Sequence, residues 1–359
     1  MHGGAEKVLV NLVNNLDKTK YDLTLYSIFD EGVNKQFLKS DVRYQSRFKK
    51  VFRGNSQIMK LFPPKWLYRF FIKERYDIVV SYLEGPAARI ISGCPDRLTK
   101  KIAWIHVELN NEKEAKVGFF SINAARKAYN KYDRIVAVSA KVGECFKKNI
   151  TTKVPLQVLY NTNETEQIRK LGLEPMENVF DPTTVQVCSV AKIATTKGFD
   201  RLLIAHKRLI GEGFRHQVNI LGIGSEQGNL ERKARELGVG ESFRFLGFHQ
   251  NPYKYVSKCD FYVCSSHVEG FSTAVSEALI LGVPVVSTNC SGAYELLGYH
   301  NEYGIVTENN TDAIYGGMRE MLADPEKLAH YRIQADKRGR YFSKENTVKA
   351  VEDLLDELT

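Results

Sequence analysis

The sequence predicts an α/β protein of two domains, each with a doubly wound parallel β-sheet. Short apolar runs alternate with amphipathic stretches along the 359 residues, which is the pattern of repeated βαβ units. The alternation is interrupted by one polar stretch, which carries Pro175 and Pro182. Because a chain of this length is ordinarily two domains, we interpret that stretch as the boundary.

We therefore expect a Rossmann-like N-terminal domain over 1–163, a linker over 164–184 and a C-terminal domain over 185–340. A last helix over 341–359 is expected to pack back towards the first domain. Ligands of open parallel sheets bind beyond the carboxyl ends of the strands. Two such domains facing each other would form an interdomain cleft.

The strand candidates are short runs of apolar residues between polar or turn residues. In the first half they are Leu23–Ile28, Asp77–Tyr82, Ile102–His106, Arg134–Val138 and Gln157–Leu159, and in the second half Val185–Val190, Val218–Leu221, Phe243–Leu246, Phe261–Cys264 and Val283–Ser287.

The helix candidates have apolar residues at helical spacing, with capping or breaking residues at their ends. They are Ala5–Leu16, Pro64–Lys73, Ser121–Lys131, Ala140–Lys148, Phe199–Gly211, Gln227–Leu237, Pro252–Ser257, Thr273–Leu281, Thr311–Leu322 and Asn346–Leu358.

Cysteine usage and apolar content bear on location. The six cysteines show no pairing or metal-binding spacing, and several lie inside apolar runs, where Cys behaves as a small hydrophobic residue. No signal peptide opens the chain, and no apolar run approaches the ~20 residues of a spanning helix. We expect a protein of the reducing cytoplasm.

The positive charge is concentrated in one segment. The whole chain has a net charge of +9, and Arg43–Arg75 alone holds ten Lys/Arg and one acid, Glu74. Aromatic residues are interleaved with these cations, a composition that suits anionic lipid headgroups. The alternative is a solvated face over an aromatic core. No nucleic-acid-binding motif accompanies the charge, so we expect no nucleic-acid partner.

The most informative motif is Glu269-Gly-Phe-Ser-Thr-Ala-Val-Ser-Glu277, which joins an apolar strand to a helix. Its helix begins with free backbone N–H groups, which attract an anion such as a diphosphate. A carboxylate on each side could accept hydrogen bonds from sugar hydroxyls. The simpler interpretation is one acid favoured by the helix dipole and one solvated acid.

The other strands of the second half also end in polar or glycine-rich loops. Lys192 and Lys197-Gly198 follow the first strand, Gly222-Ile-Gly224 the second, Phe248 the third and Ser291 the fifth. Carboxyl ends of parallel strands meet at one rim, so we expect these loops to lie together. Lysines there could hold a diphosphate and offset leaving-group charge.

In this order the motifs resemble those of the retaining GT-B glycosyltransferases of family 4. The similarity covers nearly the whole chain and is densest from Val185 to Glu295. It implies a GT-B architecture and transfer of a sugar from a nucleoside-diphosphate sugar, with a UDP-sugar the expected donor and a GDP-sugar next. The acceptor is expected to be a lipid-linked or cell-surface polysaccharide intermediate, such as a capsule precursor.

The resemblance also implies roles for single residues. Lys192, Lys197 and the backbone of Ser272, Thr273 and Ala274 would hold the diphosphate, Glu277 the ribose and Glu269 the transferred sugar. Phe248 and its loop would line the base, and Gly222 would also belong to the donor-binding site. In the first domain, the Gly3-Gly4 loop would close over the phosphates and His106 would contact the donor sugar. Glu269, His106 and Lys197 are the catalytic candidates.

The resemblance implies a front-face displacement in which the leaving phosphate deprotonates the acceptor, so the protein supplies positioning and electrostatics. No nucleophile with an adjacent base stands out, and the chain contains no Asp-x-Asp. We therefore expect no cofactor and no metal requirement.

The sequence departs from the family pattern at three points. Relatives place a strand before the glycine pair, so the first strand of the N-terminal sheet is expected to be missing here. Ala191-Lys192 stands where Gly-Arg is usual, and lysine lacks the planar fork of arginine. Ser272 replaces a common glycine.

Two alternatives stay open. A non-catalytic GT-B subunit could keep the fold to hold an active transferase at a membrane. A nicotinamide-dependent oxidoreductase is suggested by Gly222-x-Gly224-x3-Gly228, although this spacing is one residue too long for the dinucleotide fingerprint.

Overall fold

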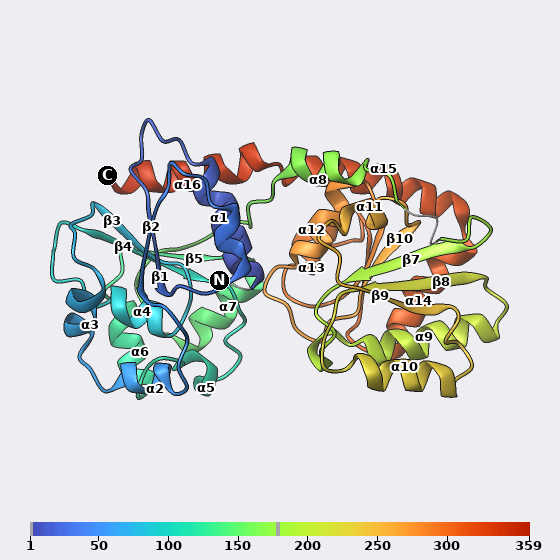
Figure 1. Cartoon of the computed structure of the whole chain (residues 1–359), viewed down its shortest axis with the longest axis horizontal. Helices are drawn as coiled ribbons and strands as arrows, with labels where there is room; N and C mark the ends of the chain where they lie inside the picture. Colours follow the sequence, from blue (N-terminus) through green and yellow to red (C-terminus); the bar gives the residue numbers. More distant parts are fainter. Residues whose placement is uncertain (1–2, 177–179) are drawn as a thin grey trace. The chain divides into compact units, whose positions relative to one another are not determined.

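The structure is a computed structural model that describes residues 3–176 and 180–359. The chain forms two compact units, Met1–Asn163 with Lys344–Thr359 and Glu164–Ser343. Every β-strand pair in the described residues is parallel. The predicted class, α/β with parallel sheets in two domains, is confirmed (Figure 1).

The second unit contains one six-stranded sheet in the order β12-β11-β10-β7-β8-β9. Its strands are β7 (Val185–Val190), β8 (His216–Leu221), β9 (Phe243–Gly247), β10 (Phe261–Cys264), β11 (Val285–Thr288) and β12 (Ile305–Thr307). The chain runs outward from β7 to β9 and then returns to β10 beside β7. The connections that follow β7 and β10 therefore run to opposite sides of the strand order, which makes the β7/β10 boundary the topological switch point of the sheet, where ligands of such sheets bind.

Helices cover both faces of this sheet (Figure 1). The apolar sides of α9 (Phe199–Gly211), α10 (Gln227–Glu236) and α14 (Thr311–Ala323) share one core with β7, β8 and β10. On the other face, α8 (Thr165–Gly172), α11 (Tyr253–Val256) and α12 (Thr273–Ile280) pack through Ile168, Tyr253 and Ile280. The unit is completed by η2 (Thr195–Lys197), α13 (Ala293–Leu297) and α15 (Pro325–Tyr341).

The first unit contains two separate parallel sheets. One pairs β1 (Thr24–Phe29) with β2 (Arg43–Phe48), and the other has the order β3 (Ile78–Ser81), β4 (Lys100–Ile105), β5 (Arg134–Ala137), β6 (Leu156–Val158). Its helices are α1 (Gly4–Asn15), η1 (Val33–Phe37), α2 (Asn55–Lys60), α3 (Pro64–Phe71), α4 (Pro86–Ile91), α5 (Glu112–Ala115), α6 (Ile122–Tyr129) and α7 (Ala140–Asn149).

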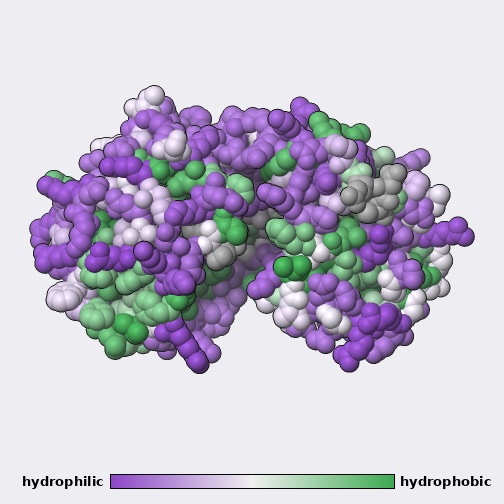
Figure 2. Space-filling model, in the orientation of Figure 1, coloured by the Kyte–Doolittle hydropathy of each residue, from purple (hydrophilic) through white to green (hydrophobic). Residues whose placement is uncertain are grey.

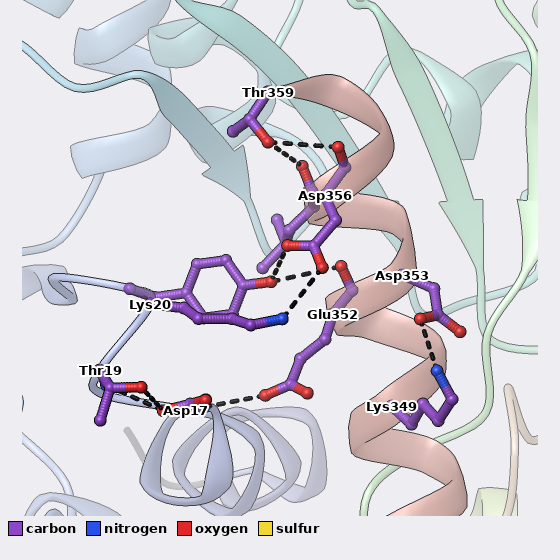
Figure 3. Close-up of polar contacts among 10 residues, drawn as sticks. Asp17, Thr19, Lys20, Lys349, Glu352, Asp353, Asp356 and Thr359 are labelled. Carbon is purple, nitrogen blue, oxygen red and sulfur yellow. Dashed lines mark hydrogen bonds and ion pairs between the residues drawn. The ribbon is translucent and has the colours of Figure 1, made fainter.

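The last helix, α16 (Lys344–Leu358), belongs to the first unit. Glu352 accepts a hydrogen bond from the Asp17 backbone at 2.8 Å, and Asp356 pairs with Lys20 at 3.3 Å. Figure 3 shows this polar contact between α16 and the turn after α1. Apolar residues at helical spacing, among them Val351 and Leu354, are buried beneath it.

The segment 164–184 was predicted as a linker, but part of it is a packed helix. Ser257 donates to the Gly172 carbonyl at 2.6 Å, and Asn251 donates to the Leu171 carbonyl at 3.0 Å. Because α8 is only two turns long, its buried Ile168 and half-buried Leu171 are too few to reveal helical periodicity. Residues 177–179 of the predicted linker lie outside the described residues.

Candidate active site

The loop after β7 is held tightly against the loop after β10. Gly198 has φ +64°, and a Cβ there would lie 2.1 Å from the Ser265 carbonyl oxygen. Only glycine permits both this left-handed backbone and this approach. In return, the Ser265 hydroxyl donates to the Lys197 carbonyl at 2.8 Å. The two loops at the switch point thus form one frame.

This frame brings together Lys197 and Glu269, two predicted catalytic residues that are far apart in sequence. Lys197 Nζ lies 2.6 Å from Glu269 Oε1, and both side chains are largely buried. The Ser266 hydroxyl donates to the same oxygen at 2.7 Å. A cation and a carboxylate are therefore fixed side by side at the ends of β7 and β10.

Thr288, at the end of β11, supports the Glu269 carboxylate indirectly, through the backbone that carries Ser266. Its hydroxyl lies 2.7 Å from the Ser266 carbonyl oxygen and 3.3 Å from that of Cys264. This contact fixes the turn from which Ser266 reaches Glu269. Neither Ser266 nor Thr288 was predicted as a site residue, because a lone hydroxyl beside a strand carries no sequence signal.

The N-terminus of α12 opens at the same rim. Ser272 is its N-cap, and its hydroxyl accepts from the Val275 backbone. The cap leaves the first-turn N–H groups of Thr273 and Ala274 without a helical partner. Those groups and the helix dipole favour an anion, and their phosphate-binding role stays a prediction.

Glu277 lies on the first turns of α12 and is only 8% exposed. The Tyr253 hydroxyl of α11 donates to Glu277 Oε1 at 3.0 Å. The contact orients one carboxylate oxygen, so Tyr253 is a positioning residue. Sequence reasoning missed it because a tyrosine in a one-turn helix resembles any core aromatic residue.

The glycines after β8 have a packing role. A Cβ on Gly222 would lie 2.0 Å from the Ala191 carbonyl oxygen, and one on Gly224 would lie 2.0 Å from that of Ile193. Gly-x-Gly thus lets the backbone after β7 approach the backbone after β8, without any need for a dinucleotide. Lys192, between these contacts, is exposed, as is Phe248 after β9.

His106 lies in the first unit, just after β4. It is buried, its ring centroid lies 4.6 Å from that of Tyr82, and burial lowers its pKa to about 3. It is therefore neutral at ordinary pH. Its Nε2 atom is buried without a hydrogen-bond partner in the described residues.

A carboxylate that the sequence analysis did not single out, Glu84, holds the backbone around His106. It accepts from the backbone N–H groups of His106 and, at 3.0 Å, of Val107. Burial raises the pKa of Glu84. Glu84 is thus a positioning residue for His106, linking the ends of β3 and β4.

The predicted Gly3-Gly4 loop forms the start of α1. Gly3 is the N-cap, and its N–H donates to Glu6 Oε2 at 3.0 Å. Asn34 donates to the Gly3 carbonyl at 3.0 Å. The turn is thereby fixed within the first unit, with both glycines exposed.

The described residues contain neither a metal-binding cluster nor a membrane-spanning helix. No group of three or more His, Cys, Asp or Glu side chains there is arranged to hold a metal ion. Within residues 3–176 and 180–359, no helix combines the length and apolar character needed to cross a bilayer.

Family models match both halves of the chain. The model described as "Glycosyltransferase Family 4" matches residues 2–167, and that described as "Glycosyl transferases group 1" matches residues 174–338. The second match contains Lys192, Lys197, Glu269 and Glu277.

Two relatives act on bacterial glycans according to their names. The chain is 33% identical to an N-acetylgalactosamine-N,N'-diacetylbacillosaminyl-diphospho-undecaprenol 4-alpha-N-acetylgalactosaminyltransferase of Campylobacter jejuni, over 55% of this chain and 52% of that one. It therefore spans about half the length of that relative. It is 23% identical to the lipopolysaccharide 1,6-galactosyltransferase of Salmonella typhimurium, over 91% of this chain and 88% of that one.

Among solved structures, Anabaena Alr3699/HepE in complex with UDP has a TM-score of 0.77 at 16% identity, covering 99% of this chain and 96% of that one. This likeness shows the fold. Because glycosyltransferase family models match both halves of the chain, we discard the oxidoreductase alternative. The chain belongs to the GT-B glycosyltransferases of family 4.

Proposed function

We propose that the protein transfers a sugar from a UDP-sugar to an acceptor hydroxyl with retention of the anomeric configuration. The observation that carries this proposal is the Lys197–Glu269 pair, fixed at the β7/β10 switch point beside the open N-terminus of α12. A cation, N–H donors and a carboxylate are the groups needed to hold a diphosphate next to a sugar. The UDP complex of Alr3699/HepE and a UDP-glucose complex of the same protein support the choice of donor.

In this proposal the diphosphate binds the Thr273 and Ala274 N–H groups and Lys197, and Lys192 reaches it from solvent. Glu277, oriented by Tyr253, accepts hydrogen bonds from the ribose. Phe248 and its loop line the base, and Gly222 belongs to the same donor-binding site. Glu269 accepts hydroxyls of the transferred sugar.

The transfer breaks the bond between the anomeric carbon and the diphosphate oxygen, and forms one to the acceptor oxygen on the same face. The acceptor proton passes to the departing phosphate. Lys197 stabilises the negative charge that develops on that phosphate. For the first unit, we propose that His106 contacts the donor sugar.

We propose that the reaction needs no metal, since two lysines and a helix N-terminus can supply the electrostatic stabilisation. Turnover should be unchanged by a chelator. If a divalent cation restored activity lost on chelation, this part of the proposal would be wrong.

The proposed acceptor is a lipid-linked or cell-surface polysaccharide intermediate, in keeping with the relatives named for undecaprenol-linked and lipopolysaccharide substrates. A capsule precursor is one such acceptor. Such a substrate implies a cytoplasmic protein that binds the inner face of the plasma membrane.

The alternative function is an inactive subunit that supports another glycosyltransferase. Glu269→Ala separates the two: it should abolish transfer while the melting temperature stays within a few degrees of wild type. No turnover by the purified wild type, together with undiminished transfer by a complex that contains the variant, would favour the supporting role.

A further inference from the structure

The strongest unassigned feature is the outer surface of α2 and α3, in the first unit. These short helices bury Met59, Leu67 and Phe71 in a local core with Ile90. Their opposite side is also apolar: Trp66 is 67% exposed and Leu61 71% exposed. The other exposed apolar residues of this surface are Ile58, Phe62 and Phe70. Exposing a contiguous apolar surface to water costs free energy, and such surfaces mark sites of interaction with a protein or a membrane.

The exposed apolar residues are held rigidly. Arg89 of α4, only 7% exposed, donates to the Lys60 carbonyl at 2.9 Å and to the Phe62 carbonyl at 2.8 Å. At the start of α3, a Cβ on Gly93 would lie 2.0 Å from the Pro64 carbonyl oxygen. The Phe62 and Trp66 rings stack with centroids 6.5 Å apart. The surface is therefore fixed by the fold.

Cations border this surface. Lys49, Lys50 and Arg53, in the loop between β2 and α2, are exposed, as are Lys65 and Arg69 of α3. None of them forms an ion pair with a residue in the described ranges, whereas Arg43 and Arg75, at the ends of the basic segment, both do. No acidic residue occurs between Val42 and Lys73. Figure 2 shows apolar surface bordered by hydrophilic residues over α2 and α3.

We propose that the α2–α3 surface, meaning these five apolar residues and five cations, binds an anionic lipid bilayer. Apolar side chains would enter the interface while cations pair with lipid phosphates, as in interfacial amphipathic helices. Trp66 suits this place because indole prefers the bilayer interface. A folded protein partner of ordinary composition would leave five unpaired cations facing it, and burying unpaired charges is costly.

The chain itself offers a direct probe, since its only two tryptophans are Trp66 and Trp104. Trp104 is buried, so Trp104→Phe leaves Trp66 as the single reporter. Vesicles of roughly 70% phosphatidylcholine and 30% phosphatidylglycerol should shift its emission to the blue, and brominated lipids should quench it. Pure phosphatidylcholine should have a weaker effect, and added salt should reduce the effect of anionic vesicles.

Variants test the cations and the apolar residues of the α2–α3 surface separately. Lys49→Gln with Lys50→Gln and Arg53→Gln should weaken binding to anionic vesicles by roughly a hundredfold at low salt, since each cation near an anionic surface strengthens binding several-fold. Trp66→Ser with Leu61→Ser should weaken it comparably. Leu98→Ser, at a residue 79% exposed elsewhere in the same unit, and Lys127→Gln with Lys131→Gln are matched controls that should bind as wild type does.

Emission of Trp66 unchanged by anionic vesicles would overturn the proposal and favour a protein or nucleic-acid partner. Equal binding by the cation variant would overturn it as well. The vesicle assay contains no donor and no acceptor, so its failure is distinct from failure of the proposed sugar transfer. If UDP raises the melting temperature of each variant by as much as it raises that of wild type, the rest of the fold is intact.

Discussion

Lys197 Nζ and Glu269 Oε1 lie 2.6 Å apart, although 72 residues separate them in the chain. The pair joins the loops after β7 and β10, where the direction of the sheet's winding reverses. A bound diphosphate would attract Lys197, whereas a sugar hydroxyl would donate to Glu269. The pair thus keeps both groups ordered before a donor arrives, which reduces the reorganisation needed on binding.

The first prediction concerns the two members of this pair. Glu269→Gln should lower kcat by about 10²–10³-fold, the range for removing one preorganised hydrogen-bonding group at a reacting centre, with little loss of UDP affinity. Lys197→Ala should weaken the binding of UDP and also lower kcat. Steady-state kinetics and calorimetric titration with UDP separate the effects.

The matched control is Glu212→Gln, which breaks the exposed pair of Glu212 with Arg319 in the same unit. Because exposed pairs contribute little, its kinetics should equal those of wild type. Equal losses of UDP affinity in Glu269→Gln and Lys197→Ala would contradict the separate roles.

The second prediction concerns Glu277. If its carboxylate accepts from ribose hydroxyls, wild type should bind UDP about 10-fold or more tightly than 2′,3′-dideoxy-UDP. Glu277→Ala should bind both equally, and Tyr253→Phe should lose part of the preference because Oε1 is no longer oriented. Titration calorimetry measures each affinity. A preference that survives in Glu277→Ala would place the ribose elsewhere.

The third prediction concerns Gly198. Gly198→Ala would force a Cβ against the Ser265 carbonyl, at a φ of +64°. We expect a loss of about 2–4 kcal/mol in the free energy of unfolding of the second unit, together with weaker UDP binding.

Gly211→Ala is the matched control for Gly198. It lies at the end of α9, where a Cβ meets nothing within 4 Å, so stability should stay within about 1 kcal/mol of wild type or rise. Urea unfolding compares the two variants. Equal stabilities would show that the loops after β7 and β10 are not held by the close approach.

The fourth prediction concerns pH. In the second unit His206 Nδ1 and His216 Nε2 lie 2.8 Å apart, and burial lowers the pKa of His206 to about 3 and of His216 to about 4. In the unfolded chain both titrate near 6.5. The unfolded state therefore binds more protons below that pH, and stability present above about pH 6.5 is lost as the pH falls towards about 4.

As the pH falls through this window, each buried histidine should lower the free energy of unfolding by up to about 1.4 kcal/mol per pH unit. Urea unfolding from about pH 7 to about pH 5 measures the slope. His216→Gln should flatten the slope, while the exposed His330→Gln should leave it unchanged. A wild-type slope near zero would contradict the assignment of neutral buried histidines.

The positions of the candidate site residues could be predicted from the sequence, whereas the contacts that hold them could not. Lys197, Glu269 and Glu277 were identifiable because their spacing places them after particular strands. Their partners were not: Tyr253 and Thr288 act through contacts between elements distant in sequence. Glu84 was missed for the same reason, since it caps backbone N–H groups that follow another strand.

Strand β2 and helix α15 were not predicted from the sequence because contacts with distant residues determine them. Strand β2, with its sequence RYQSRF, has too few apolar residues to indicate a strand, and it forms by pairing with β1. Helix α15 has an extended polar surface and buries only Tyr331, Ala335 and Gly339 fully. Its position is set by a close approach: a Cβ on Gly339 would lie 2.3 Å from the Leu279 carbonyl oxygen.

Every role proposed for the site requires a nucleoside diphosphate to bind at the β7/β10 rim. The most direct test is a calorimetric titration of UDP, GDP, ADP and NAD into wild type, Lys197→Ala and Glu277→Ala. We predict that UDP binds wild type most tightly and that each variant loses about tenfold or more in affinity. Equal UDP affinity in all three proteins, or no nucleoside diphosphate binding to folded wild type, would contradict the proposed roles.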